Sequence, residues 1–312
     1  MKRIPCLDGL RALSIGMVLI GHANGTRALV LGSGEPRSVH FDLSLVGDVA
    51  HLGVRVFFVL SGFLITTLLL QERERTGTLD LKGFYVRRTC RIFPAFYVYL
   101  AVVGALSLLS LASVSPADLA CAATYMTNFH PNRAWLVGHL WSLSVEEQFY
   151  LLWPATMLLL GASRARRVVV GALFAAPLAR LGWHTLWPGH DTYIGEAFPT
   201  VMDAIATGCL LAMTRATLEA NPRYMRWLRS RALWLVVPAA FVVNHFADHA
   251  RVFWLVGESI QNLAIFALVH RVVVMPDTLA GRVLEWRPLA FVGTLSYSLY
   301  LWQQPFMNRT SG

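Results

Sequence analysis

Ionisable side chains inside an apolar run are the first residues of this sequence that could do chemistry. The segment LDGLRALSIGMVLIGH holds Asp8, Arg11 and His22. Charged groups are costly in lipid and by default mark a site or a pathway. Asp8 and Arg11 lie one helical turn apart and can pair, whereas His22 lies roughly 16 Å further along a helix axis. His22 could be a neutral base, with a hydrogen-bonded core histidine as an equal alternative.

A second polar set lies in HLWSLSVEEQFYLLWP, where His139, Ser142, Glu146 and Tyr150 recur at intervals of three and four residues. These intervals place them on one face of a helix. The carboxylate could orient His22 or bind a sugar hydroxyl, and the alternative is an interfacial aromatic belt with the acids among headgroups. Because neighbouring side chains point in different directions, we expect only one of Glu146 and Glu147 to face inward.

Three arginines occupy what reads as a loop, GFYVRRTCRIFPAFY. Guanidinium groups bind phosphates in a bidentate manner, so Arg87, Arg88 and Arg91 form a candidate site for a phosphorylated donor. A positive-inside membrane anchor is an equal alternative.

A fourth segment, GVRVFFVLSGFLIT, places Arg55 among apolar residues and contains the pair Ser61-Gly62. We expect Arg55 to snorkel outward from near the end of its span. Small residues such as this pair allow a helix or a ligand to come close, and helix packing is their usual meaning.

No metal site is expected. His245, Asp248 and His249 have ligand spacing, but they lie at the end of a span without a further ligand. The four cysteines are widely separated and have no metal-binding or disulfide spacing.

The elements that must position these residues are membrane helices. With a mean hydropathy of +0.51 and 14% charged residues, the 312-residue chain lacks the charged surface of a soluble domain. The sequence predicts an all-α, polytopic membrane helix bundle of nine to ten spans, in a single domain over residues 1–312. The expected spans are 10–30, 49–70, 92–112, 138–161, 168–187, 199–214, 232–248, 252–274 and 288–307, with 116–127 as an interfacial segment.

The basic residues predict the orientation of the bundle. Arginine is concentrated in alternate loops, which places the N-terminus in the cytoplasm and the protein in the inner (plasma) membrane. The net charge of +9 is scattered through these loops, which excludes a nucleic-acid patch and makes the bilayer the expected partner.

Together these segments resemble the acyltransferase 3 family of membrane O-acyltransferases, which modify bacterial surface polysaccharides, peptidoglycan and some antibiotics. The four segments occur in the order of the family's motifs, and the tail adds GTLSYSLYLWQQP. The resemblance therefore runs from Leu7 to Pro305.

The resemblance implies a role for each site residue. His22 and Glu146 would be catalytic, and Arg11 with Arg87, Arg88 and Arg91 would bind the donor, acyl-CoA, which is a substrate and not a resident cofactor. The acceptor would be a hydroxyl of a surface polysaccharide or related glycan, and acetyl is the expected acyl group. The substrate-binding residues expected beside them are Asp8, Ser142, Tyr150 and Asp203, the last from the segment MDAIATGCLLA.

Three features depart from the family pattern. Gln303 stands where many relatives have a histidine, so a tail histidine cannot be essential here. Arg55 occupies a place where an acid is frequent, which puts its pairing in doubt. Relatives usually continue through one more span, so we expect a chain that is one span shorter than theirs.

Two other functions fit the same residues. Intramembrane polar groups also line the pathways of transporters, so a transporter or flippase for a lipid-linked sugar is one alternative. An O-acyltransferase acting on a small antibiotic is the other.

Overall fold

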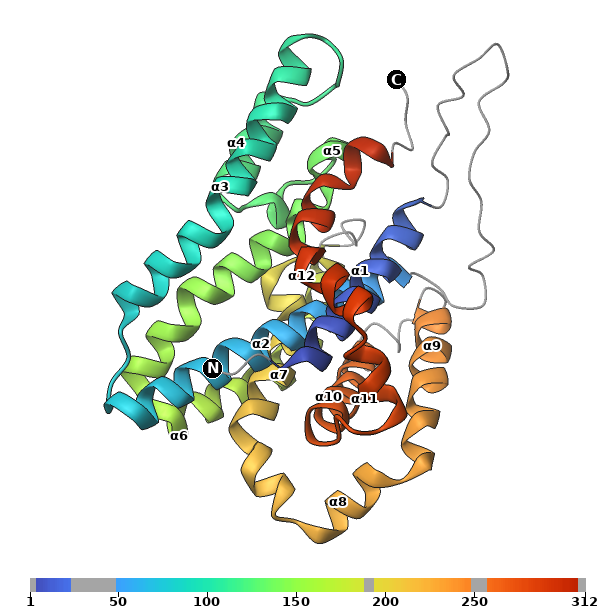
Figure 1. Ribbon diagram of the computed structural model, residues 1–312. Helices are drawn as coiled ribbons and strands as arrows, with labels where there is room; N and C mark the ends of the chain where they lie inside the picture. The colour runs from blue at the N-terminus through green and yellow to red at the C-terminus, as the bar shows by residue number, and fades with distance from the viewer. Residues whose placement is uncertain (1–3, 24–48, 188–193, 248–256, 308–312) are drawn as a thin grey trace.

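Figure 1 shows a computed structural model, which describes residues 4–23, 49–187, 194–247 and 257–307. These residues form α-helices joined by short 3₁₀ turns, with no strand among them. The helices are α1 (Pro5–Ala23), α2 (Val49–Thr76), α3 (Leu81–Leu108), α4 (Pro116–Ala123), α5 (Trp135–Gly138), α6 (Leu140–Leu186), α7 (Phe198–Glu219), α8 (Pro222–Arg229), α9 (Val236–Ala247), α10 (Glu258–Val274), α11 (Leu279–Leu284) and α12 (Arg287–Trp302). The 3₁₀ turns are η1 (Thr127–Phe129), η3 (Arg231–Leu235) and η5 (Gln304–Phe306).

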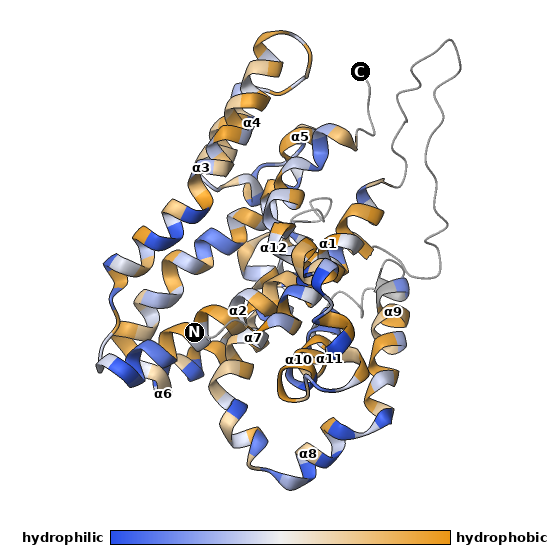
Figure 2. Cartoon of the chain, in the orientation of Figure 1, coloured by the Kyte–Doolittle hydropathy of each residue, from blue (hydrophilic) through white to orange (hydrophobic). Residues whose placement is uncertain are grey.

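The all-helical class is confirmed. Within the described ranges, four helices are long and apolar enough to cross a membrane, namely α1, α2, α3 and α7. The expected total of nine to ten spans stays a prediction. Hydrophilic residues gather on α8 and near the junction of α2 and α3 (Figure 2), as expected for segments that leave the apolar layer.

The long helix α6 consists of two arms that run in opposite directions. Gly161 interrupts it with φ 70° and ψ 164°, a conformation that favours glycine. Before this break, Trp153 donates to Thr66 on α2, eleven residues beyond Arg55. After it, Arg180 binds the same two carboxylates as Arg55, so the second arm has returned along α2. The arms correspond to the two apolar runs expected on either side of position 161.

The arginine-rich segment is helical, and the expectation of a loop there is wrong. Helix α3 begins at Leu81, well before the expected position 92, because Asp80 caps it by accepting a hydrogen bond from the amide of Gly83. The helix continues through Pro94. Arg88 and Arg91 are therefore held by regular backbone and face a direction that the helix sets.

Residues 116–123 form a helix of eight residues, α4, which is too short to span a bilayer. Ser115 and Asp118 form a capping box at its start. Partial burial alone would raise the pKa of Asp118, but hydrogen bonds with Ser115, the Ala134 amide and His130 lower it below its ordinary value. The ionised carboxylate thus ties α4 to the segment before α5.

Helices α2 and α7 cross at backbone contact through two glycines. A Cβ on Gly62 would lie 2.1 Å from the carbonyl oxygen of Ile205, and one on Gly208 would lie 2.0 Å from that of Val59. Larger residues would force the helices apart. Packing is therefore the role of Gly62, while its neighbour Ser61 faces elsewhere.

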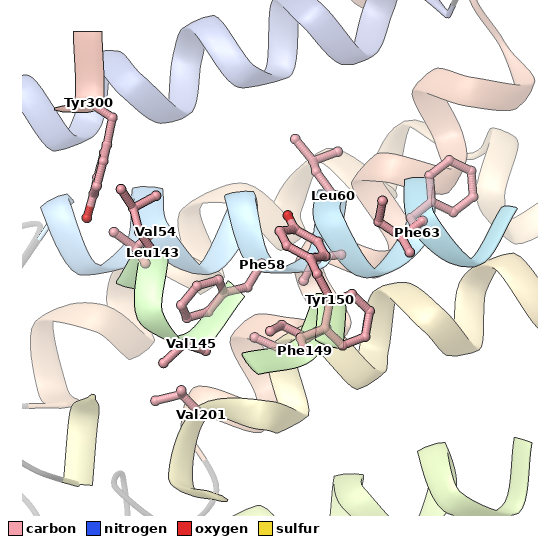
Figure 3. Packing of buried hydrophobic residues seen from close by; sticks show 14 of the residues in the cluster. Val54, Phe58, Leu60, Phe63, Leu143, Val145, Phe149, Tyr150, Val201 and Tyr300 are labelled. Carbon is pink, nitrogen blue, oxygen red and sulfur yellow. The ribbon is translucent and has the colours of Figure 1, made fainter. Parts of the chain in front are cut away.

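Aromatic and branched side chains fill the space between these helices. Figure 3 shows Phe58 of α2, Leu143 and Val145 of α6, and Val201 of α7 in one cluster. Phe58 is buried and meets the ring of Trp141 edge-on at 5.9 Å. This core fixes α6 against α2, which in turn fixes the polar face of α6.

The glycine crossing predicts that Gly62→Ala destabilises the protein. The added methyl collides with the backbone of α7, which cannot shift as a side chain can, so we expect a loss of about 1–3 kcal/mol. Tryptophan fluorescence during heating in detergent measures it as a lower Tm. Gly171→Ala in α6 is the matched control because a Cβ there meets nothing within 4 Å. Equal Tm values for the two variants would contradict the crossing.

Candidate functional site

A cavity of about 490 Å³ lies between α1, α2, α3, α6 and α12. Its wall combines charged and hydroxyl groups with apolar side chains such as Val54, Phe57 and Ile92. A pocket of this size and mixture is typical of a small-molecule site.

One side of the cavity is basic. Arg11, Arg88 and Arg91 line it, together with Asp8. Asp8 pairs with Arg11 at 3.5 Å, which confirms the pairing predicted from their spacing. Arg87 is exposed on α3 and is not among the residues that line the cavity.

Three of the four residues predicted to share a face, Ser142, Glu146 and Tyr150, line the cavity. His139 does not line it and is buried, with Nε2 3.1 Å from the carbonyl oxygen of Leu301. Ser61 donates a hydrogen bond of 2.5 Å to Glu146 and accepts one of 3.0 Å from the Tyr150 hydroxyl. The guanidinium carbon of Arg88 lies 3.4 Å from the centre of the Tyr150 ring, a cation–π contact. These contacts join α2, α3 and α6 at one polar surface.

The expectation that only one of the adjacent acids faces inward is wrong. Glu146 and Glu147 both line the cavity. Neighbouring side chains on a helix differ by about 100° in direction, and this cavity is bordered by helices on several sides. Arg88 lies 4.0 Å from Glu147 and offsets the repulsion between the two carboxylates.

Helix α12 completes the wall with hydroxyl groups that were not among the predicted site residues. Tyr300 forms a hydrogen bond of 2.5 Å with Ser142 and donates one of 2.9 Å to the carbonyl of His139. Tyr297 also lines the cavity and donates to the carbonyl of Ile92. The only signal in the sequence was the polar content of the apolar run SYSLYLW.

His22 lies at the other end of α1 and is not among the residues that line the cavity. Its ring is half-buried, with Nδ1 3.0 Å from Oε1 of Gln303 and the Trp135 ring edge-on at 5.7 Å. The sequence predicts that an acid such as Glu146 orients His22. The structure instead places Gln303 beside His22, and Ser61 beside Glu146, and of the two predicted groups only Glu146 is among the residues that line the cavity.

Asp203, expected near the substrate, lies in a buried ion network and does not line the cavity. Arg180 binds its carboxylate at 3.0 Å and Arg55 at 3.5 Å. Both arginines also bind Glu258 at 2.7 Å. Among the described residues the network holds two positive and two negative groups, whose charges balance and make their burial possible.

The expected outward snorkelling of Arg55 is wrong. Arg55 is 1% exposed, and besides the carboxylates it donates to the side chain of Asn262. Helical periodicity does not reveal these partners, because they lie about 150 and 200 residues further along the chain, on α7 and α10.

The described part of the chain contains no group of three side chains that could hold a metal ion. Of the residues with ligand spacing, Asp248 and His249 lie outside the described residues.

Fold and cavity together define a helical membrane protein with a charged cavity inside its bundle. The model of the acyltransferase 3 family, described as an acyltransferase domain, matches residues 4–308. The chain therefore belongs to this family. No solved structure matches it.

The names of curated relatives are consistent with this family assignment. The peptidoglycan O-acetyltransferase OatA of Listeria monocytogenes is 27% identical over 99% of the chain. YrhL of Bacillus subtilis, named as a candidate peptidoglycan O-acetyltransferase, and a candidate O-acetyltransferase of Staphylococcus aureus strain COL are each 29% identical over 97% of the chain. The chain spans about half the length of these relatives, with 50%, 48% and 50% of each covered respectively.

The ion network predicts that Asp203→Asn strongly destabilises the fold. The substitution leaves a buried net positive charge, which costs about 3–5 kcal/mol when one partner of a buried pair is removed. Thermal unfolding in detergent and the monodisperse yield measure the loss. Asp277→Asn is the matched control because Asp277 is exposed. A stable Asp203→Asn variant would show that the network contributes little.

Proposed function

We propose that this chain transfers an acetyl group from acetyl-CoA to a hydroxyl of a cell-surface glycan of the peptidoglycan type. The observation that carries the proposal is the geometry of α1. Arg11, near the start of this helix, lines the cavity, and His22 lies in the last turn of the same helix. A cation for the donor's phosphates and a base for the transfer are thus held on one rigid helix. The names of the relatives support the acceptor class.

Arg11, Arg88 and Arg91 form the donor site of this proposal. Guanidinium groups bind phosphate oxygens in a bidentate manner and stay charged, so they suit the diphosphate of coenzyme A. Under the orientation predicted from the loop charges, this side faces the cytoplasm, where acetyl-CoA is made. Arg87 lies outside the cavity and has a smaller part in donor binding.

The acyl end of the donor follows the cavity away from the arginines. The wall it passes is polar, with Ser61 and Glu146 on one side and Ser142 with Tyr300 on another. Tyr300 lies three residues, or one helical turn, before Gln303, which contacts His22. A narrow pantetheine arm along this path brings the thioester toward His22.

His22 supplies the chemistry by one of two routes. As a base, it takes the proton of the acceptor hydroxyl while the oxygen attacks the thioester carbonyl; the thiolate of CoA leaves and receives the proton. As a nucleophile, its ring attacks the thioester carbonyl and displaces the thiolate of CoA, which leaves with the ring proton; the acceptor oxygen then displaces the ring from the acetyl group, and the hydroxyl proton returns to the imidazole. A burst of CoA release from enzyme without acceptor distinguishes the second route.

The first prediction of this function is that His22→Ala lowers kcat by about 10²–10⁴-fold, because it removes the general base or the acyl carrier. The assay follows radiolabelled acetyl transfer from acetyl-CoA to a soluble N-acetylglucosamine–N-acetylmuramic acid disaccharide in detergent. His184→Ala, at a half-buried histidine of α6, is the control for loss of an imidazole. Undiminished turnover by His22→Ala would exclude His22 from catalysis.

The second prediction concerns donor binding. Arg91→Gln and Arg88→Gln should each raise the KM for acetyl-CoA about 10-fold or more, with a smaller change in kcat, because the phosphates are bound equally in the ground and transition states. Arg75→Gln removes the same charge from an exposed position at the end of α2 and should leave KM unchanged. An equal effect of all three substitutions would indicate a general charge effect in place of a site.

A further inference from the structure

A glutamine contacts His22 at the end of α12. The distance between Nδ1 of His22 and Oε1 of Gln303 is 3.0 Å, which is a hydrogen bond between residues 281 positions apart. Gln303 is only 3% exposed. In such a place an amide has little freedom to exchange its partner for water, so the contact constrains the imidazole ring.

The backbone around Gln303 is itself held in place. Its carbonyl accepts hydrogen bonds from the amides of Phe306 and Met307 in the turn that follows α12. The indole of Trp135 donates to the carbonyl of Met307, and the same ring meets His22 edge-on. The imidazole is thus fixed between two side chains that one turn holds together.

We propose that Gln303 is a positioning residue that selects the tautomer of His22. An amide oxygen only accepts, so the proton of the neutral imidazole must lie on Nδ1, where it is donated to Gln303. The basic lone pair is then on Nε2, the nitrogen that takes a proton or an acyl group. The inference rests on the proposed function for its catalytic consequence, and on the geometry alone for the tautomer.

The amide nitrogen of Gln303 makes it possible to test whether the oxygen of this side chain is the atom that binds His22. Among the described residues, Nε2 of Gln303 is buried without a hydrogen-bond partner, so the contact that orders the side chain is the one made by its oxygen. Gln303→Glu keeps an accepting oxygen and removes the amide hydrogens. Gln303→Leu removes both and keeps a side chain of similar size.

The chain also offers a matched control. Gln304 is the next residue and is 1% exposed, and its Oε1 has no hydrogen-bond partner among the described residues. Gln304→Leu therefore makes the same chemical change in the same turn. Thermal unfolding of each variant reports whether the turn stays folded.

The first experiment reads the tautomer without requiring activity. Protein labelled with ¹⁵N-histidine is compared with His22→Ala, which identifies the ring resonances of His22 by their loss. We expect the Nδ1-protonated tautomer in the wild type, in Gln303→Glu and in Gln304→Leu, and a shift toward the other tautomer in Gln303→Leu. An Nε2-protonated ring in the wild type would overturn the proposal.

The second experiment measures kcat and KM for acetyl-CoA with the disaccharide acceptor. Gln303→Leu should lower kcat about 10²-fold with KM within about 2-fold, since the donor site lies elsewhere. Gln303→Glu should restore kcat to within about 10-fold of the wild type, and Gln304→Leu should leave it unchanged. Loss of kcat in Gln303→Glu equal to that in Gln303→Leu would overturn the positioning role.

Different results would contradict the proposed acetyl transfer and the positioning role of Gln303. A wild-type protein that does not transfer acetyl groups contradicts the proposed function, while the tautomer spectra still decide the role of Gln303. An active wild type with an inactive His22→Ala and a fully active Gln303→Leu contradicts the positioning role alone.

Discussion

The neutral network of Arg55, Arg180, Asp203 and Glu258 is the constraint on which the rest of this bundle depends. These four side chains come from α2, the second arm of α6, α7 and α10, so one buried set of charges fixes four helices relative to one another. An isolated charge in such a place is costly. The helices must therefore meet in an arrangement that brings all four groups together.

The cost of burying an unpaired charge also distinguishes the charges of this network from those that line the cavity. In the network each charge is offset by an opposite charge; Arg55, Arg180 and Asp203 are almost completely buried, and Glu258 is partly buried. The cavity instead has three arginines with Asp8, Glu146 and Glu147 around an open volume of about 490 Å³. Charges that border an open volume keep part of their hydrogen-bonding capacity for a ligand, and this distinguishes the cavity as the candidate site.

The site is built on rigid elements. Arg11 and His22 share α1, and α12 lies against α1 so closely that a Cβ on Gly293 would be 1.8 Å from the carbonyl of Asp8. This contact brings the end of α12, with Gln303, to the end of α1. Groups held in this way need little reorganisation during a reaction.

The sequence by itself determined the helical class, the Asp8–Arg11 pair and the shared face of Ser142, Glu146 and Tyr150, because these follow from periodicity within one helix. Only the tertiary structure decided the partners of Arg55 and His22, the inward position of both Glu146 and Glu147, and the exclusion of Asp203 from the cavity. Such contacts join residues up to 281 positions apart. A helical pattern states which way a side chain points, whereas helix crossings decide what it meets.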